Sequence, residues 1–167
     1  MRNNILKKGK TFIIAEIGNN HEGNFQLAKK MILKAWKCGV SAVKLQYIEP
    51  KTFFVDEKQI NKYEKFKFTE KQINQLIEFS IKKKILLFWT FFDFESFEKY
   101  KSKVKAFKIG SGECNNFPLV DYIASFKKPI IISTGMNDVS SIKKSIKIIK
   151  KRGTQFAILH TTNLYPT

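Results

Sequence analysis

Six short apolar runs in this chain each stop at polar side chains that can bind a ligand or take part in catalysis. The runs cover residues 12–17, 42–43, 85–89, 106–107, 129–132 and 156–159. Strands of a parallel sheet are buried on both faces and read as continuous apolar runs, and ligand sites form at their carboxyl ends. The pattern therefore predicts a parallel sheet whose strand ends share one active site.

The segments between these runs have the period of amphipathic helices. Two sets of apolar residues each share one helix face. They are Ala28, Met31, Ile32 and Ala35, and Ile73, Leu76, Ile77 and Ile81. Asn24, Thr69 and Asp138 are suited to cap the helices that follow them, Thr69 in a capping box with Gln72. Further helices are expected over residues 139–151, 94–101 and 118–126, and Gly39 and Gly153 are suited to end two of the helices.

Strict alternation of strands and helices predicts an α/β fold with right-handed crossovers. No G-x-G-x-x-G turn marks a dinucleotide fold, because no third glycine follows Gly110 and Gly112. Polar chemistry at every strand end instead favours the TIM (β/α)8 barrel, which needs about 250 residues. With 167 residues, we expect one incomplete domain over residues 1–167, truncated to about six strands and five helices, with exposed sheet edges.

The charge of the chain points to an anionic partner. The formal net charge is +17, carried almost wholly by lysine, since arginine occurs only at positions 2 and 152. Specific nucleic-acid recognition relies on arginine, so no specific nucleic-acid partner is expected. The basic surface would attract an anionic substrate. No run approaches the length of a membrane span or the apolar core of a signal peptide. Cys38 and Cys114 form no close-spaced motif, so a cytoplasmic protein is expected.

Five segments carry the polar residues and, in order, resemble the sialic acid synthase family. They are residues 15–23 (AEIGNNHEG), 43–46 (VKLQ), 108–116 (KIGSGECNN), 133–137 (STGMN) and 160–167 (HTTNLYPT). The family comprises the N-acetylneuraminate synthases and their legionaminate and pseudaminate relatives. The resemblance implies a barrel enzyme that condenses phosphoenolpyruvate with an N-acetylated aldose, N-acetylmannosamine or a di-N-acetylated hexose, and releases phosphate.

The same resemblance implies roles for particular residues. Those matching phosphoenolpyruvate-binding positions are Lys44, Thr90, Lys108, Ser111, Ser133 and Asn163. Two ammonium groups beside a glycine-rich turn suit a phosphate and a carboxylate. Those expected to face the sugar are Glu16, Gln46 and Tyr165, while Glu113, with Glu16, is a candidate for proton transfer or for placing the attacking water. A solvated lysine at position 44 and structural acids at positions 16 and 113 remain alternatives.

The resemblance also implies features beyond this chain. The family's divalent metal, typically Mn²⁺, is held by histidines farther along than residue 167, so no metal ligands are expected here. We expect His21 to order its loop or touch substrate, and His160 to be an interior histidine. The carboxyl-terminal barrel strands and a small antifreeze-like domain would also be missing. The full-length family is expected to form homodimers, and the isolated chain is expected to be an inactive or incomplete fragment.

Two departures from the family pattern keep alternatives open. Residues 89–92 read Trp-Thr-Phe-Phe where the family has Ser-Thr-Pro-Phe, and the connection from Gln46 to Thr69 lacks a longer insertion. The acceptor sugar is thus left open. Another phosphoenolpyruvate-condensing barrel, of the octulosonate or heptulosonate phosphate type, would want arginines for a second phosphate. A non-catalytic fragment that binds polyanions is the third alternative.

Overall fold

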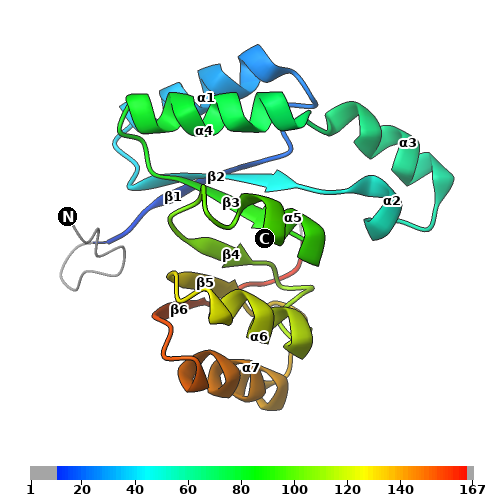
Figure 1. Ribbon diagram of the computed structural model, residues 1–167, viewed down its shortest axis with the longest axis vertical. Coiled ribbons are helices and arrows are strands. Elements are labelled where there is room, and N and C mark those ends of the chain that lie inside the picture. Colours follow the sequence, from blue (N-terminus) through cyan, green and yellow to red (C-terminus); the bar gives the residue numbers. More distant parts are fainter. Residues whose placement is uncertain (1–10, 165–167) are drawn as a thin grey trace. The chain divides into compact units, whose positions relative to one another are not determined.

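The computed structural model describes residues 11–164 (Figure 1). These residues form two compact units, 11–104 and 105–164. In both units strands alternate with helices, and every paired strand runs parallel to its neighbour. The predicted α/β alternation with parallel strands is therefore confirmed, while the single domain stays a prediction.

Residues 11–104 contain three strands in the order β1–β2–β3. The strands are β1 (Ile14–Gly18), β2 (Ala42–Tyr47) and β3 (Leu87–Phe91), and the helices are α1 (Phe25–Lys37), α2 (Pro50–Phe53), α3 (Glu57–Phe66), α4 (Glu70–Lys82) and α5 (Phe94–Tyr100). Helices α1 and α4 lie side by side (Figure 1), with the Lys29 ammonium 5.1 Å from the Phe79 ring centroid. The register pairs Glu16 with Lys44, which brings two predicted site residues together.

The predicted helix signals of this unit are confirmed. The Asn24 side chain accepts a hydrogen bond from the Leu27 N–H at 2.9 Å, and Thr69 and Gln72 form the capping box. The apolar stripes bury Ala28 and Ile32 in α1 and Ile73, Leu76 and Ile77 in α4, whereas the expectation of Ile81 on the same inward face is wrong, because its side chain is exposed. These stripes remove apolar surface from water against the sheet, which is the main term that stabilises an amphipathic helix.

Helices α2 and α3 were not predicted. Helix α3 is polar overall and buries none of its residues fully, and its N-terminal cap is Asp56. A ring contact joins it to the segment that precedes it: the Tyr63 ring lies 4.6 Å from Phe54, and within the helix Tyr63 lies 5.6 Å from Phe66. The loop after β1 packs closely against the carboxyl end of α3, because a Cβ on Gly23 would lie 2.0 Å from the Lys65 carbonyl oxygen.

Residues 105–164 contain strands in the order β4–β5–β6. The strands are β4 (Phe107–Ile109), β5 (Ile130–Ser133) and β6 (Phe156–Leu159), and the helices are α6 (Phe117–Ser125) and α7 (Val139–Lys151). The expected cap at Asp138 is present, and buried Ile149 faces inward. Two buried hydroxyls donate hydrogen bonds that fix the helices. Ser145 in α7 donates to the Cys114 carbonyl, and Thr154 donates to the carbonyl of Ala124 in α6 at 2.7 Å.

The strands extend farther into the polar motifs than the apolar runs indicated. Lys44 and Gln46 lie within β2, Thr90 within β3 and Lys108 within β4, and Ser133 is the last residue of β5. A lysine fits a buried strand when its stem packs among apolar groups and its amine finds a partner. Within residues 11–164, no helix is long and apolar enough to cross a membrane.

Candidate active site

Lys44 is a buried cation paired with Glu16 on the adjacent strand. The lysine is 5% exposed, and its Nζ lies 2.5 Å from Glu16 Oε2. The Glu16 side chain is half exposed, so water or a ligand can reach the carboxylate from one side. A charge this deeply buried needs a partner of opposite sign. The alternative of a solvated lysine at this position is therefore wrong.

Thr90 lies within β3, in the segment that departs from the family pattern. It is buried in β3 at 1% exposure and pairs in register with Gln46. Its Oγ1 has no hydrogen-bond partner among the described residues. A buried hydroxyl without a partner costs free energy, and it is available to bind a ligand.

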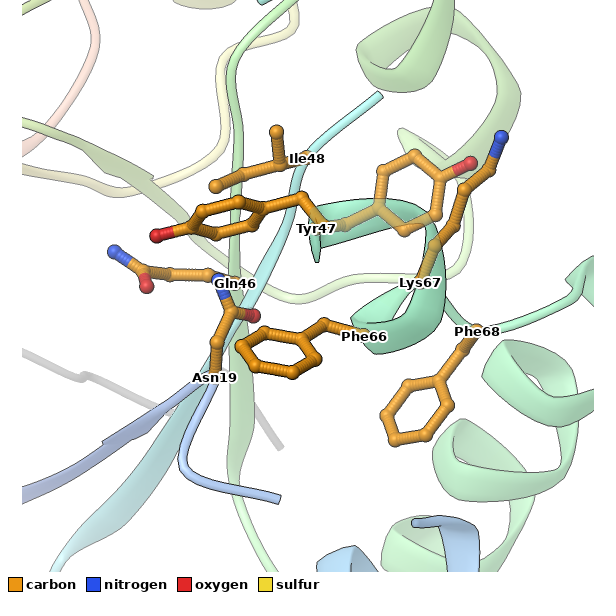
Figure 2. Close-up of a pocket in the computed structure, with 8 residues that line it drawn as sticks. Asn19, Gln46, Tyr47, Ile48, Phe66, Lys67 and Phe68 are labelled. Atoms are coloured by element: carbon orange, nitrogen blue, oxygen red, sulfur yellow. The ribbon is translucent and has the colours of Figure 1, made fainter. Parts of the chain in front are cut away.

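Gln46 lines a pocket at the end of β2 (Figure 2). The pocket joins the loop after β1, the end of β2 and the segment around the end of α3. Its lining residues are Asn19, Gln46, Tyr47, Ile48, Tyr63, Phe66, Lys67 and Phe68. The Lys67 ammonium is paired with Glu49 at 2.7 Å, and burial, with the Glu49 charge next, raises the pKa of Tyr47. The open space inside is about 10 Å³, room for about one water molecule, so the pocket by itself does not hold a sugar.

In residues 105–164, Lys108 is the second buried cation. It is 5% exposed, and its Nζ donates to Ser133 Oγ at 2.6 Å and to the Ile109 carbonyl at 3.2 Å. Both of these acceptors are neutral groups. The neighbouring strands β4 and β5 thus present an ammonium and a hydroxyl together at their carboxyl ends, which suits an anion.

The loops after β4 and β5 are joined at Ser111. Its Oγ accepts a hydrogen bond from the Gly135 N–H at 3.1 Å, and its carbonyl accepts one from Asn137 Nδ2 at 2.8 Å. Asn163, from the segment after β6, reaches the same point, since a Cβ on Gly135 would lie 2.9 Å from its Oδ1. Three strand-end segments therefore bring the predicted ligands Ser111 and Asn163 together around one glycine.

Glu113 follows Ser111 in the same turn and has a perturbed acidity. Burial raises the pKa of its carboxyl group, and the nearby charge of Lys108 acts in the opposite direction with a smaller effect. Its Oε2 is buried without a hydrogen-bond partner among the described residues. A carboxyl group whose pKa is raised by burial is suited to proton transfer.

The histidines differ from one another. His21 is buried and stacks on Phe68 at 4.2 Å, and its Nδ1 accepts the Gly23 N–H at 3.1 Å, which confirms that it orders its loop. Burial lowers the pKa of His21 to about 4, so the ring is neutral. The expectation of an interior position for His160 is wrong, because its side chain is exposed just after β6, where the polar motif faces water.

No metal centre is formed within residues 11–164. No group of three or more histidine, cysteine, aspartate or glutamate side chains lies close enough together to hold an ion. A catalytic transition-metal site takes about three protein ligands. The described residues thus do not fit the metal that the family resemblance implies.

The structure assembles the predicted residues in two groups. Residues 11–104 hold Glu16, Lys44, Gln46 and Thr90, and residues 105–164 hold Lys108, Ser111, Glu113, Ser133 and Asn163. Tyr165 lies outside the described residues. No local sequence pattern marks the pocket wall from α3. The contacts of Gly135 and Asn137 were not predicted either, although both residues stand in the STGMN segment.

Relatives of this chain are synthases and related proteins of about twice the matched length. A family model described as the NeuB family matches residues 31–167. An N,N'-diacetyllegionaminic acid synthase of Campylobacter jejuni is 35% identical over 94% of this chain and 53% of its own length. The chain spans about half the length of the curated relatives that it matches.

Solved structures agree with this similarity. The crystal structure of an N-acetylneuraminic acid synthetase from Leptospira borgpetersenii, in complex with citrate, has a TM-score of 0.90 and 33% identity over 95% of this chain and 56% of that chain. The crystal structure of a phospho-2-dehydro-3-deoxyheptonate aldolase (DAHP synthase) from Thermotoga maritima has a TM-score of 0.71 and 17% identity over 93% of this chain and 43% of that chain, and it shares the fold alone. The predicted fold class is confirmed: six parallel strands of a TIM-barrel-type α/β fold. On its motifs, its fold and the match over residues 31–167, the chain belongs to the NeuB family of sialic acid-type synthases.

Proposed function

We propose that the protein condenses phosphoenolpyruvate with an N-acetylated aldose, N-acetylmannosamine or a di-N-acetylated hexose, to a sialic-type acid and phosphate. Family membership supports this reaction class, and the named products of two relatives, legionaminic acid and N-acetylneuraminic acid, are acids of that type. Because the chain spans about half of its relatives' length, the activity is assigned to the protein that contains this chain together with the remaining part of the barrel.

The observation that carries the proposal is the buried pair of Lys108 and Ser133. The Lys108 ammonium is 5% exposed and donates to Ser133 Oγ at 2.6 Å, and a buried cation beside a hydroxyl at the strand ends suits an anionic ligand. Ser111 and Asn163 lie at the strand ends beside β5 and would add a hydroxyl and an amide. We assign the phosphate or the carboxylate of phosphoenolpyruvate to this group.

We assign the cluster of Lys44, Glu16 and Thr90 to the same reaction. By the family resemblance Lys44 and Thr90 bind phosphoenolpyruvate: Lys44 would give up its pairing with Glu16 for an anionic group, and the Thr90 hydroxyl, which has no partner among the described residues, would donate to it. Glu16 would then be free to accept a hydrogen bond from the sugar. Gln46, in its aromatic pocket, and Tyr165, beyond the described residues, would contact the sugar as well.

The chemistry follows from the reactivity of the two substrates. C3 of phosphoenolpyruvate attacks the aldehyde carbon of the open-chain sugar, and the new C–C bond leaves positive charge at C2. Water adds at C2, and the intermediate loses phosphate by C–O cleavage to leave a 2-keto acid. Glu113, with its raised pKa, is placed to transfer a proton in the addition of water or to orient that water.

Further parts of the proposal rest on the resemblance alone. The complete protein would act in the cytoplasm as a homodimer, with no specific nucleic acid and no membrane as partner. The match to the NeuB family, against 17% identity to the heptulosonate phosphate-type structure, favours a sialic-type acid over the other condensing barrels.

Selective ligand binding tests the proposal on this chain. Isothermal titration calorimetry should show that phosphoenolpyruvate binds more tightly than inorganic phosphate or pyruvate, because only phosphoenolpyruvate presents both anionic groups. With phosphoenolpyruvate present, N-acetylmannosamine or a di-N-acetylated hexose should bind, and unsubstituted mannose should bind more weakly. Equal binding of the three anions would refute the assignment and favour diffuse attraction to the basic surface.

A further inference from the structure

We propose that Asn137 is a positioning residue that aims the Ser111 hydroxyl at the anionic substrate. The inference rests on the proposed function, since it concerns the same anion site, but it adds a residue that contacts neither the reacting carbon nor the phosphate. All of its contacts lie within residues 105–164.

Asn137 joins two strand-end loops through its amide nitrogen. Nδ2 donates to the Ser111 carbonyl at 2.8 Å, after β4, and to the Gly135 carbonyl at 2.7 Å, after β5. Both partners are carbonyl oxygens, which can only accept, so the nitrogen must be the atom that faces them. The orientation of the amide group is thus set by its partners. Both donor hydrogens are used to hold the loops together.

The held loops determine where the Ser111 proton points. Because Ser111 Oγ accepts the Gly135 N–H at 3.1 Å, one lone pair of the hydroxyl is occupied. The hydroxyl hydrogen then has to point elsewhere, and it has no acceptor among residues 11–164. A phosphate or carboxylate oxygen is an acceptor of the required kind. Losing the Asn137 contacts would release both the Ser111 carbonyl and the Gly135 backbone that orients Oγ.

A third segment depends on the same geometry. Gly135 is buried, and a Cβ in its place would lie 2.9 Å from Asn163 Oδ1, 3.1 Å from Ser111 Oγ and 3.2 Å from the Thr161 carbonyl oxygen. Movement of the Gly135 backbone would therefore displace Asn163 as well. Asn137, through Gly135, sets the relative positions of two proposed substrate ligands.

The unused end of the amide separates this role from simple packing. Asn137 Oδ1 is buried and has no hydrogen-bond partner among the described residues. An unsatisfied buried acceptor costs free energy, so a residue selected for stability alone would avoid it. The Asn137 amide instead leaves its oxygen unsatisfied while Nδ2 donates to the Ser111 and Gly135 carbonyls, which holds the two loops together.

The test compares Asn137→Asp and Asn137→Ala with Thr154→Ala in the full 167-residue chain. Aspartate keeps the shape of the side chain but has no N–H to donate. Thr154→Ala is the matched control, because it also removes a buried hydrogen bond from a side chain to a backbone carbonyl in the same unit. Thr154 lies before β6, away from the carboxyl ends of the strands. The readouts are the Kd for phosphoenolpyruvate from calorimetry, the Tm without ligand, and the exchange rate of the Gly135 amide proton by NMR.

We expect both Asn137 variants to raise the Kd about tenfold or more, from the loss of two hydrogen bonds, and to speed the exchange of the Gly135 amide. Thr154→Ala should lower the Tm by a similar amount yet leave the Kd within about twofold. An unchanged Kd with Asn137→Asp, or an equal rise with Thr154→Ala, would overturn the inference. If the unaltered chain fails to bind phosphoenolpyruvate, the proposed function fails, and unchanged Gly135 exchange in the variants would then separately refute the positioning role.

Discussion

Removal of the Lys108 ammonium should abolish most of the stabilisation that phosphoenolpyruvate gives to the folded chain. The lysine is 5% exposed and donates to Ser133 Oγ at 2.6 Å, so its amine is held in place before a ligand arrives. Lys108→Ala deletes the charge and the stem. Lys108→Met deletes only the charge and keeps an unbranched apolar stem in the buried site.

The magnitude follows from the type of contact. A charge-assisted hydrogen bond contributes about 1.5 to 3 kcal/mol, which corresponds to about 13- to 160-fold in Kd. Phosphoenolpyruvate at 100 times its Kd would stabilise the unaltered chain by about 2.7 kcal/mol, and the same concentration would stabilise the variant by about 0.3 to 1.3 kcal/mol. For a chain of this size, the ligand-induced rise in Tm should fall from about 5 to 10 °C to about 1 to 5 °C.

The assay is thermal unfolding with and without phosphoenolpyruvate, each variant being compared with its own ligand-free Tm. This removes the separate effect of the substitution on folding. Lys83→Ala is the matched control, since Lys83 is an exposed lysine at the C-cap of α4 and its loss removes the same formal charge. Inorganic phosphate at equal concentration reports non-selective anion binding.

Two outcomes would refute the reasoning. If Lys83→Ala reduces the ligand-induced shift as much as Lys108→Ala, the binding is attraction to a surface of net charge +17 and the site assignment is wrong. If Lys108→Met retains the full shift, the ammonium does not bind the ligand. Folding of the methionine variant is checked by its circular dichroism spectrum.

Three further predictions concern the loops, the pH response and turnover. Gly135→Ala should destabilise the chain by about 1 to 3 kcal/mol, because the new Cβ meets three oxygen atoms, whereas Gly112→Ala meets nothing within 4 Å and should unfold at nearly the same denaturant concentration as the unaltered chain. Burial lowers the pKa of His21 from 6.5 to about 4, so between these pH values the unfolded chain binds a proton that the folded chain does not. The free energy of unfolding is therefore highest, as far as this histidine is concerned, above pH 6.5. It should fall by up to about 3 kcal/mol as the pH falls towards 4. In urea unfolding, the free energy of unfolding of His21→Gln should depend less on pH over that range than that of the unaltered chain. The same pH dependence in both proteins would contradict this prediction. The purified 167-residue chain, given phosphoenolpyruvate, Mn²⁺ and N-acetylmannosamine, should release no phosphate above background, since its described residues form no metal site; steady turnover would disprove this.

Local patterns in the sequence were sufficient for the regular elements of the fold. The stripe through Ile73, Leu76 and Ile77, with the capping box at Thr69, identified α4 because helix periodicity and capping act within a few residues. The apolar runs identified the strands for a similar reason, and their polar ends located the candidate site residues by chain position. The family resemblance extended this to roles that no local pattern could supply.

Tertiary structure decided which of these residues meet and how each is ionised. The pairing of Lys44 with Glu16 depends on the register of β1 and β2, and the contact of Lys108 with Ser133 depends on β4 lying beside β5. The raised pKa of Glu113 and the lowered pKa of His21 come from burial. Helix α3 and the role of Asn137 were missed for the same physical reason: long-range packing and burial join residues far apart in the chain, and no short window of sequence contains them.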